Sequence, residues 1–146
     1  MEKIKLPEFH AIGITVESNW EGLHREMPLK WEHFKKRLPE IENRKTDVMM
    51  DISLYEENGV YTQFICVEME GESQIPSDMK RITIPEKNYL YHLHNGKREN
   101  IANTFGAMYD YAKFNGLSAG KMKIDKGYTV EGKELEHHLY IELPWT

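Results

Sequence analysis

Apolar residues recur along the chain at two spacings, which predict strands and helices in a definite order. The segment FHAIGITVE, residues 9–17, is rich in β-branched and apolar residues and is typical of a strand. The next segment carries large apolar residues at steps of four, three and four, which is the spacing of one helical face: Met27, Trp31, Phe34 and Leu38. We expect Pro28 in the first turn of this helix, where a missing amide proton costs nothing.

Two strands should follow at 47–55 and 61–69, joined by a tight turn at Asn58-Gly59. The order then starts again with a strand over 81–94 that is broken or bent near Pro85. A second helix is predicted over ENIANTFGAMYDYAKFNG, and strands are predicted at 121–130 and 137–143. The apolar face of this second helix has the same spacing as the first: Ile101, Phe105, Met108 and Ala112.

Strand, helix, strand, strand therefore occurs twice, which predicts an α+β fold made of two duplicated units. We expect one domain over 1–146 with pseudo-repeats at about 8–72 and 80–146. Its mainly antiparallel sheet would carry two helices on one face, with a central ligand cleft at the seam or on the uncovered face. The alternative is an ordinary α+β domain in which the two orders match by accident.

Composition and charge narrow the function classes. The apolar content of 40% supports a folded core, and a net charge of −5 argues against direct nucleic-acid binding, which needs an excess of Lys and Arg. Cys66 is the only cysteine, so no internal disulfide can form and a reducing, cytoplasmic location is expected. Neither a signal peptide nor an apolar run of membrane-spanning length occurs, so no membrane role is expected.

Histidines and the cysteine are the first candidates for chemistry. His92 and His94 share a face of a strand, and His138 could join them as a metal ligand, yet no spacing specifies a third ligand or an acidic partner. Histidines at a strand end or on a pocket wall are the plainer interpretation, so neither a metal nor another cofactor is expected. Cys66 could be a nucleophile, but a mid-strand cysteine is more often a small core residue. Glycine-rich phosphate loops, G-x-S-x-G and H-E-x-x-H are absent from the sequence.

Aromatic residues occur in every predicted element, and some of them should line a cleft between the two halves. A cleft of aromatic faces with one desolvated carboxylate attracts flat cations. Among the carboxylates, Glu68 and Glu142 lie inside predicted strands and are the leading candidates for partial burial. An exposed strand residue is an equal alternative for Glu68 and the plainer interpretation for Glu142.

From residue 67 to 96 the chain resembles the GyrI-like small-molecule-binding family, also called the AraC-type effector-binding domain. The matching pieces are Val67-Glu68, Ile75-Pro76, Ile84-Pro85, Tyr89 with His94 and Gly96, the helix from Asn100, and Leu139-Tyr140-Ile141. The earlier segment WEHFKKRLPEIENR, with Trp31 and Phe34, resembles the family's first helix. The resemblance covers nearly the whole chain and depends on the ordered set of pieces.

This resemblance implies a bacterial, multidrug-type effector-binding domain whose central cleft binds hydrophobic, often cationic, small molecules. Some family members are similar to hydrolases that use a Trp and a Glu in the cleft. In this chain Ala112 and Met122 stand at those two positions, with Asp125 as the nearest acid, so the pair is absent and catalysis is not the leading expectation.

The leading hypothesis is therefore a stand-alone binder of small molecules that senses or sequesters them, with a DNA-binding regulator or a second copy as a partner. Its expected ligand-binding residues are five aromatics, two counter-charges and one polar wall residue: Trp31, Tyr55, Phe64, Tyr109, Tyr140, Glu68, Asp125 and His92. One alternative is a hydrolase in which Glu68 activates water. The other is a protein-interaction module, of the gyrase-inhibitor type, that uses the acidic surface.

Overall fold

The computed structural model describes residues 1–144, and it contains eight strands, two α-helices and two short 3-10 turns. In chain order these are β1 (Glu2–Leu6), β2 (Phe9–Ser18), α1 (Trp20–Arg37), η1 (Leu38–Glu40), β3 (Arg44–Glu57), β4 (Val60–Met69), β5 (Lys80–Ile84), β6 (Lys87–Asn95), η2 (Arg98–Asn100), α2 (Ile101–Phe114), β7 (Lys123–Tyr128) and β8 (Glu136–Glu142). The predicted α+β fold with a repeated strand, helix, strand, strand order is confirmed. Within the described residues, neither helix combines the length and the apolar character that crossing a membrane requires.

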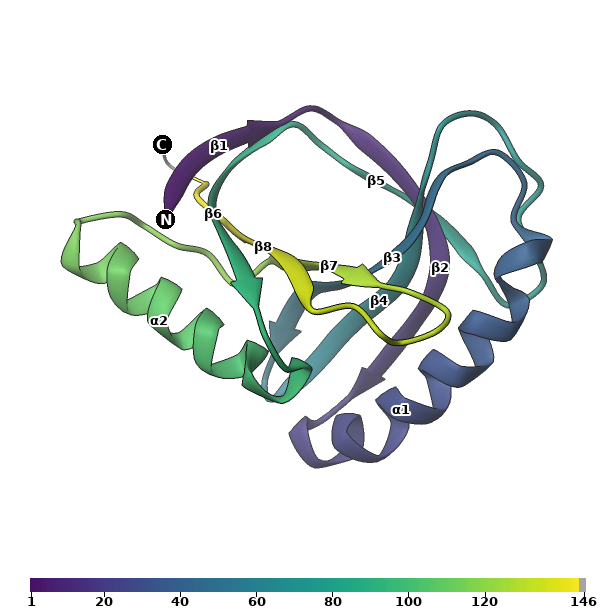
Figure 1. The fold of residues 1–146 in the computed structure, drawn as a ribbon, viewed down its shortest axis with the longest axis horizontal. Coiled ribbons are helices and arrows are strands. Elements are labelled where there is room, and N and C mark those ends of the chain that lie inside the picture. Colours follow the sequence, from purple (N-terminus) through teal and green to yellow (C-terminus); the bar gives the residue numbers. More distant parts are fainter. Residues whose placement is uncertain (145–146) are drawn as a thin grey trace.

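All eight strands form one antiparallel sheet in the order β1-β6-β8-β7-β3-β4-β2-β5, and the sheet curls into a half-barrel (Figure 1). The chain passes twice between the two edges of this sheet. Edge strand β1 continues into β2 through Pro7, and edge strand β5 continues into β6 through Pro85. The same register continues through both bends, from Leu6 opposite Lys87 to Phe9 opposite Ile84. The break predicted near Pro85 is confirmed, whereas β1 was not predicted.

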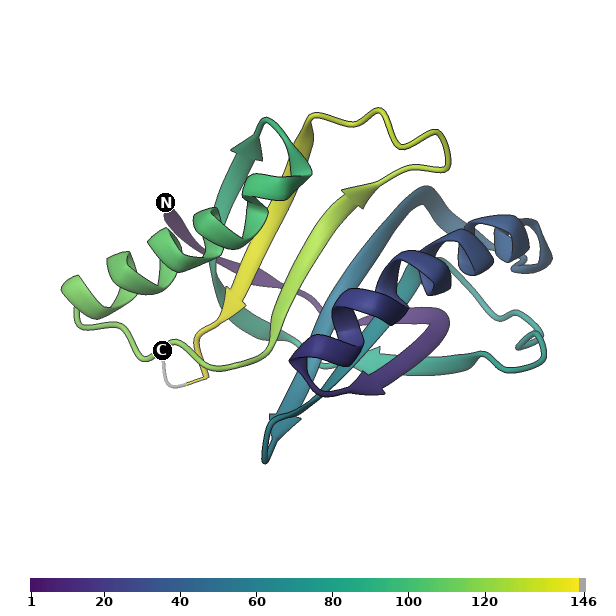
Figure 2. The same cartoon turned by 90° about the horizontal axis from the view of Figure 1, so that it is seen from below.

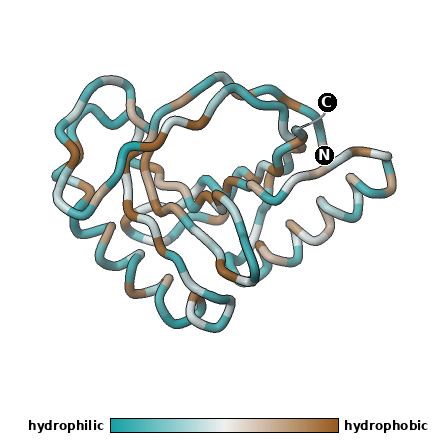
Figure 3. The backbone as a smooth tube through the Cα atoms, turned by 180° about the vertical axis from the view of Figure 1, so that it is seen from behind, coloured by the Kyte–Doolittle hydropathy of each residue, from teal (hydrophilic) through white to brown (hydrophobic). Residues whose placement is uncertain are grey.

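Side chains on the two faces of the sheet belong to different clusters. Both helices cover the outer face, where α1 packs on one group of core residues and α2 on another (Figure 2). The inner face holds a third cluster, to which neither helix contributes, under the arch formed by β1 and β5. Hydrophobic positions recur along the central strands (Figure 3). Because strand residues point alternately to the two faces, these strands supply apolar side chains to the clusters on both faces.

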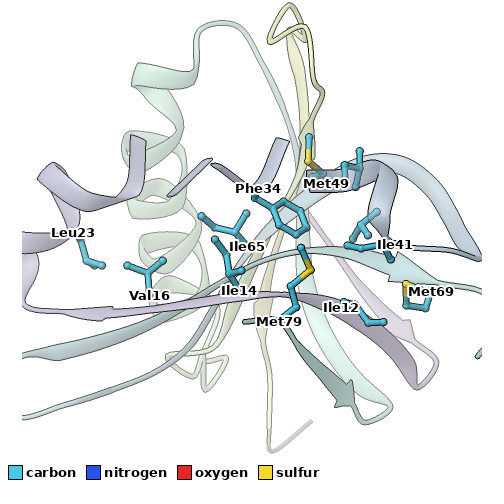
Figure 4. Close-up of a cluster of buried hydrophobic side chains, with 12 residues drawn as sticks. Ile12, Ile14, Val16, Leu23, Phe34, Ile41, Met49, Ile65, Met69 and Met79 are labelled. Atoms are coloured by element: carbon cyan, nitrogen blue, oxygen red, sulfur yellow. The ribbon is translucent and has the colours of Figure 1, made fainter. Parts of the chain in front are cut away.

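Helix α1 begins earlier than Pro28 suggests. The side chain of Asn19 accepts a hydrogen bond from the amide of Gly22 at 2.8 Å, so Asn19 caps the helix and Trp20 is its first residue. The expectation that Pro28 lies in the first turn is therefore wrong, because Pro28 lies in the helix interior. Phe34, on the predicted apolar stripe, points from α1 into the cluster on the outer face (Figure 4).

The contact between β2 and β4 depends on a glycine. A Cβ atom at Gly13 would lie 1.9 Å from the carbonyl oxygen of Ile65 and 2.6 Å from Cα of Cys66, so only glycine fits this close approach. The turn between β3 and β4 has positive φ at Asn58 and Gly59, 52° and 80°, as the two-residue hairpin prediction requires.

Candidate functional site

A large hollow lies on the outer face of the sheet, between α1 and α2, and has a volume of about 730 Å³. We call it the outer cavity. Strands β3, β4 and β7 provide its floor and the two helices its walls. The lining residues are Trp20, Leu23, His24, Met27, Pro28, Trp31, Glu32, Lys35, Asp51, Ser53, Tyr61, Gln63, Arg98, Glu99, Ile101, Ala102, Phe105, Lys123, Asp125 and Tyr128.

Aromatic rings line the α1 side of the outer cavity. Trp31 of α1 stacks on Tyr128 of β7, with ring centroids 4.3 Å apart and planes 28° apart. At the N-terminal end of α1, Trp20 lies 5.8 Å from the ring of Tyr61. Flat apolar faces that line a cavity favour an aromatic or alkyl ligand, because such surface is otherwise left in water.

Two carboxylates lie side by side on the cavity floor. Asp51 of β3 is directly opposite Asp125 of β7 in the antiparallel register, so both side chains project from the same face. Asp125 is buried, and it accepts short hydrogen bonds of 2.6 Å from Oη of Tyr128 and from Nδ1 of His137. These two donors satisfy one oxygen each and fix the orientation of the Asp125 carboxylate.

Asp51 has a different environment. Its Oδ1 accepts a 3.0 Å hydrogen bond from Nε2 of Gln63, while its Oδ2 accepts none from the described residues. Burial, together with the neighbouring charge of Asp125, raises the pKa of Asp51 from 3.8 to about 7. The free oxygen of this carboxylate is therefore available to a ligand, and its charge changes near neutral pH.

Basic groups also border the outer cavity, and Lys123 belongs to its floor because it lies on β7. Its Nζ lies 5.7 Å from the ring centroid of Phe105 and 6.0 Å from that of Tyr109. Burial lowers the pKa of Lys123, and the negative charge of Asp51 opposes that shift. With Lys35 and Arg98, the lining has three basic residues against four acidic ones, so its formal charge is slightly negative.

Behind Asp125, the hydrogen-bonded chain ends at two buried atoms without a hydrogen-bond partner among the described residues, Nε2 of His137 and Oε1 of Glu134. His137 is fully buried, and its Nε2 lies 3.7 Å from Oε1 of Glu134, which is too long for a hydrogen bond. The chain Tyr128, Asp125, His137 is built entirely from β7 and β8, so it belongs to the rigid floor. It holds the Asp125 carboxylate in place and leaves Asp51 as the carboxylate with an open oxygen.

Of the eight expected ligand-binding residues, Trp31 and Asp125 line the outer cavity together. Glu68 and Tyr140 lie on the other face of the sheet, in a second and smaller hollow that we call the inner cavity. Phe64 is fully buried in the inner-face cluster. None of these last three side chains faces the space between the helices.

The remaining expected residues line neither cavity. Tyr55 is 60% exposed near the end of β3, and His92 is half-buried on β6. Tyr109 donates a 2.9 Å hydrogen bond to the carbonyl oxygen of Gly120 and packs beside the cluster under α2. His94, considered as a metal ligand, has both ring nitrogens engaged, Nδ1 with Thr104 at 2.7 Å and Nε2 with the carbonyl of Lys97 at 2.9 Å.

The positions compared with the Trp and Glu of related hydrolases also lie outside the outer cavity. Ala112 lies on the buried face of α2, and Met122 is buried in the inner-face cluster. Within residues 1–144, no group of three or more His, Cys, Asp or Glu side chains is arranged to hold a metal ion.

Sequence reasoning missed Asp51, Lys123 and Tyr128. A signal for Asp51 was present: it lies in the strand DVMMDISLY, where a single acid interrupts an apolar run. Strand alternation also places Lys123, Asp125 and His137 on one face, once β7 and β8 are paired as neighbours. That pairing is what a single sequence does not specify.

The chain matches one family model, described as Cass2, integron-associated effector binding protein, over residues 4–143. Among curated proteins, no sequence matches this chain.

Solved structures with the same fold have low sequence identity to this chain. SAV2435, solved bound to tetraphenylphosphonium, has a TM-score of 0.75 and 11% identity, with 99% of this chain and 93% of that one covered. The EcmrR C-terminal domain has a TM-score of 0.66 and 13% identity, with 98% and 94% covered. The integron cassette protein VCH_CASS2 of Vibrio cholerae has a TM-score of 0.63 and 12% identity, again with 98% and 94% covered.

The identities are too low to indicate more than a shared architecture, but the family match spans nearly the whole chain. The predicted GyrI-like effector-binding assignment is confirmed at this level. This chain belongs to the Cass2 family of integron-associated effector-binding proteins.

Proposed function

We propose that the protein binds a small aromatic or apolar molecule that carries a positive charge, in the outer cavity between α1 and α2. The observation that carries this proposal is the pair Asp51 and Asp125, which lie in register on the floor of a cavity with stacked aromatic rings on its wall. A ligand cation would meet the free oxygen of Asp51, while its apolar body would lie against the ring of Trp31.

Two comparisons support this choice of ligand class. Effector binding is the description of the family, and SAV2435, which shares the fold, was solved with the lipophilic cation tetraphenylphosphonium. The likeness also extends to EcmrR in a complex with DNA, of which this chain covers 56%. We therefore propose a sensing or sequestering role, linked to transcription through a DNA-binding partner or a second copy.

Among the carboxylates, Asp51 is the proposed counter-charge in place of Glu68. The carboxylate of Glu68 faces the inner cavity, so it cannot contact a ligand in the outer cavity. Lys123 competes with a bound cation for the charge of Asp51, and this competition provides a test with a definite sign.

Fluorescence titration with tetraphenylphosphonium tests the proposal, because Trp20 and Trp31 both line the outer cavity. We expect saturable quenching by this cation and much weaker quenching by the neutral triphenylphosphine oxide. Asp51→Asn should weaken cation binding about tenfold or more, as expected for the loss of a charge-assisted contact in a partly buried site. Lys123→Met should strengthen it, and wild-type affinity should rise between pH 6 and pH 8 as Asp51 ionises.

Asp110→Asn is the matched control, since Asp110 is an exposed acid of α2 outside the lining. It should leave the affinity unchanged. Equal affinity for the cation and the neutral analogue, or the same loss in Asp110→Asn as in Asp51→Asn, would refute the assigned charge selection. Absence of saturable quenching by either compound would refute the site itself.

A further inference from the structure

The inner cavity differs from the outer cavity in position, size and charge. It lies on the face of the sheet away from the helices and has a volume of about 200 Å³. Most of the residues that line it are apolar, among them Met50 and Ile124. The lining also includes Tyr140 and three charged residues, Lys45, Glu68 and Lys126. None of these residues lines the outer cavity.

The three charged groups leave one positive charge uncompensated. Oε2 of Glu68 lies 3.3 Å from Nζ of Lys45, and Oε1 lies 3.7 Å from Nζ of Lys126. The side chain of Glu68 is only 16% exposed, whereas those of Lys45 and Lys126 are 57% and 31% exposed. The carboxylate is therefore held inside the wall, and the two ammonium groups lie nearer the solvent.

Tyr140 adds a third donor. Its hydroxyl makes no hydrogen bond to any described residue, although the ring lines the cavity. Burial, with Tyr91 and the charge of Glu68 adding to it, raises the pKa of Tyr140 to about 12, so the hydroxyl keeps its proton at neutral pH. The lining side chains of the inner cavity therefore bring two ammonium groups and one phenol to a single carboxylate, that of Glu68, which the two ammonium groups already share.

We propose that the inner cavity is a second binding site, which takes a small organic carboxylate. The carboxylate would lie between Lys45, Lys126 and Tyr140 and complete an alternating arrangement of two positive and two negative charges with Glu68. Its short alkyl or aryl body would lie against the apolar wall formed by Met50 and Ile124.

The size of the space limits the ligand. Pockets for drug-sized ligands have volumes of about 300–1,000 Å³, so the inner cavity suits a body no larger than a short-chain fatty acid or a benzoate. The charge preference is opposite to that of the outer cavity, although the two cavities share strands. Met50 and Asp51 are neighbours on β3, and Ile124 and Asp125 are neighbours on β7, with one residue of each pair facing each cavity.

Hexanoate is the probe, with hexylammonium and hexanol as ligands of equal chain length and different charge. NMR of the protein with labelled methyl groups would follow Met50 and Ile124, and the indole N–H of Trp31 would report on the outer cavity. We expect hexanoate to shift both methyl signals in a saturable way, with a Kd on the order of 1 mM, and to leave Trp31 unchanged. Hexylammonium and hexanol should shift the same methyl signals at least about tenfold more weakly.

Substitutions test the roles of the charged groups. Lys45→Met and Lys126→Met should each weaken hexanoate binding about tenfold, while each retains an unbranched apolar chain. Glu68→Gln should tighten it severalfold, because it frees both ammonium groups. Lys121→Met is the matched control, since Lys121 is a 72% exposed lysine paired with Glu56 at 2.8 Å, and it should have no effect.

Opposite results would overturn the proposal. Equal shifts with all three six-carbon ligands would indicate a hydrophobic hollow without charge selection. Weaker hexanoate binding in Glu68→Gln would indicate that the ion pairs serve only the fold. Lys126→Met could damage the fold, so Lys45→Met provides an independent variant at a more exposed lysine. Unchanged hexanoate affinity in Lys45→Met would contradict the carboxylate site.

Discussion

The carboxyl group of Asp51 links the stability of the protein to pH. Its pKa is about 7 in the folded protein against an ordinary value of 3.8, so the folded state holds a proton that the unfolded chain has lost between these limits. Stability must therefore fall as the pH rises through this window, at up to about 1.4 kcal/mol per pH unit from this group. About one pH unit above 7, where Asp51 is ionised in both the folded and the unfolded state, this contribution no longer changes.

Asp51→Asn removes this proton exchange, and urea unfolding at pH 4.5 and pH 7 would detect its loss. We expect the wild type to lose stability relative to the variant between these two pH values. Other carboxylates, such as Glu40 and Glu56, have a pKa lowered by ion pairs, so their contribution to stability rises with pH. This contribution is the same in the wild type and the variant, and it cancels when the stability of one is subtracted from that of the other. A parallel pH dependence in the two proteins would contradict the raised pKa of Asp51.

Single-residue predictions from the sequence depended on which face of the sheet each side chain takes. Asp125 and Trp31 lie in the outer cavity, but Glu68 faces away from it because β4 alternates faces and Glu68 adjoins Val67, which packs under α1. Glu68 and Glu142, the two leading candidates for partial burial, have side-chain exposures of 16% and 17%, so the exposed alternative considered for each is wrong. A position inside a strand was enough to suggest partial burial of these two carboxylates. Which face of the sheet a side chain lies on can be predicted only when the register of the neighbouring strands is known.

Among the secondary-structure elements, strand β2 is held against β4 by the missing side chain of Gly13. Gly13→Ala should lower the free energy of unfolding by about 2–4 kcal/mol, because the new Cβ would collide with backbone atoms of β4. The matched control is Gly106→Ala on the exposed face of α2, where a Cβ would meet nothing within 4 Å. That change should raise stability by about 1 kcal/mol. Similar effects of the two substitutions in urea unfolding would contradict this account.

The elements that the sequence predicted correctly are those with a strong local pattern. The stripe Ile101, Phe105, Met108 and Ala112 is buried along α2 as expected, and Asn58-Gly59 forms the turn between β3 and β4. Strand β1 was missed because EKIKL is short and charged, and only its pairing with β6 makes it a strand. The start of α1 was predicted too late because the prediction relied on the preference of proline for a first turn. The cap at Asn19 outweighs that preference, and the helix begins at Trp20.

For the molecule as a whole, the arrangement of the helices determines how a ligand in the outer cavity should act. α1 packs against β2 and β4, while α2 packs against β6, so the two helices are anchored to separated parts of the sheet. The outer cavity lies between them, and a bound cation would contact residues of both. Ligand binding should therefore reduce the local opening of α1 and α2 together, in addition to its general stabilising effect by mass action.

Hydrogen–deuterium exchange with and without saturating tetraphenylphosphonium measures this coupling. We expect slower exchange in Trp20–Arg37 and in Ile101–Phe114, with smaller changes in β1 and β5, which arch over the inner face. Hexanoate offers a control from the opposite face of the same sheet, and it should slow exchange near Pro7 and β7 without protecting the helices. Protection confined to one helix would show that the cation binds to that helix alone, and the cavity between the helices would then lose its assigned role.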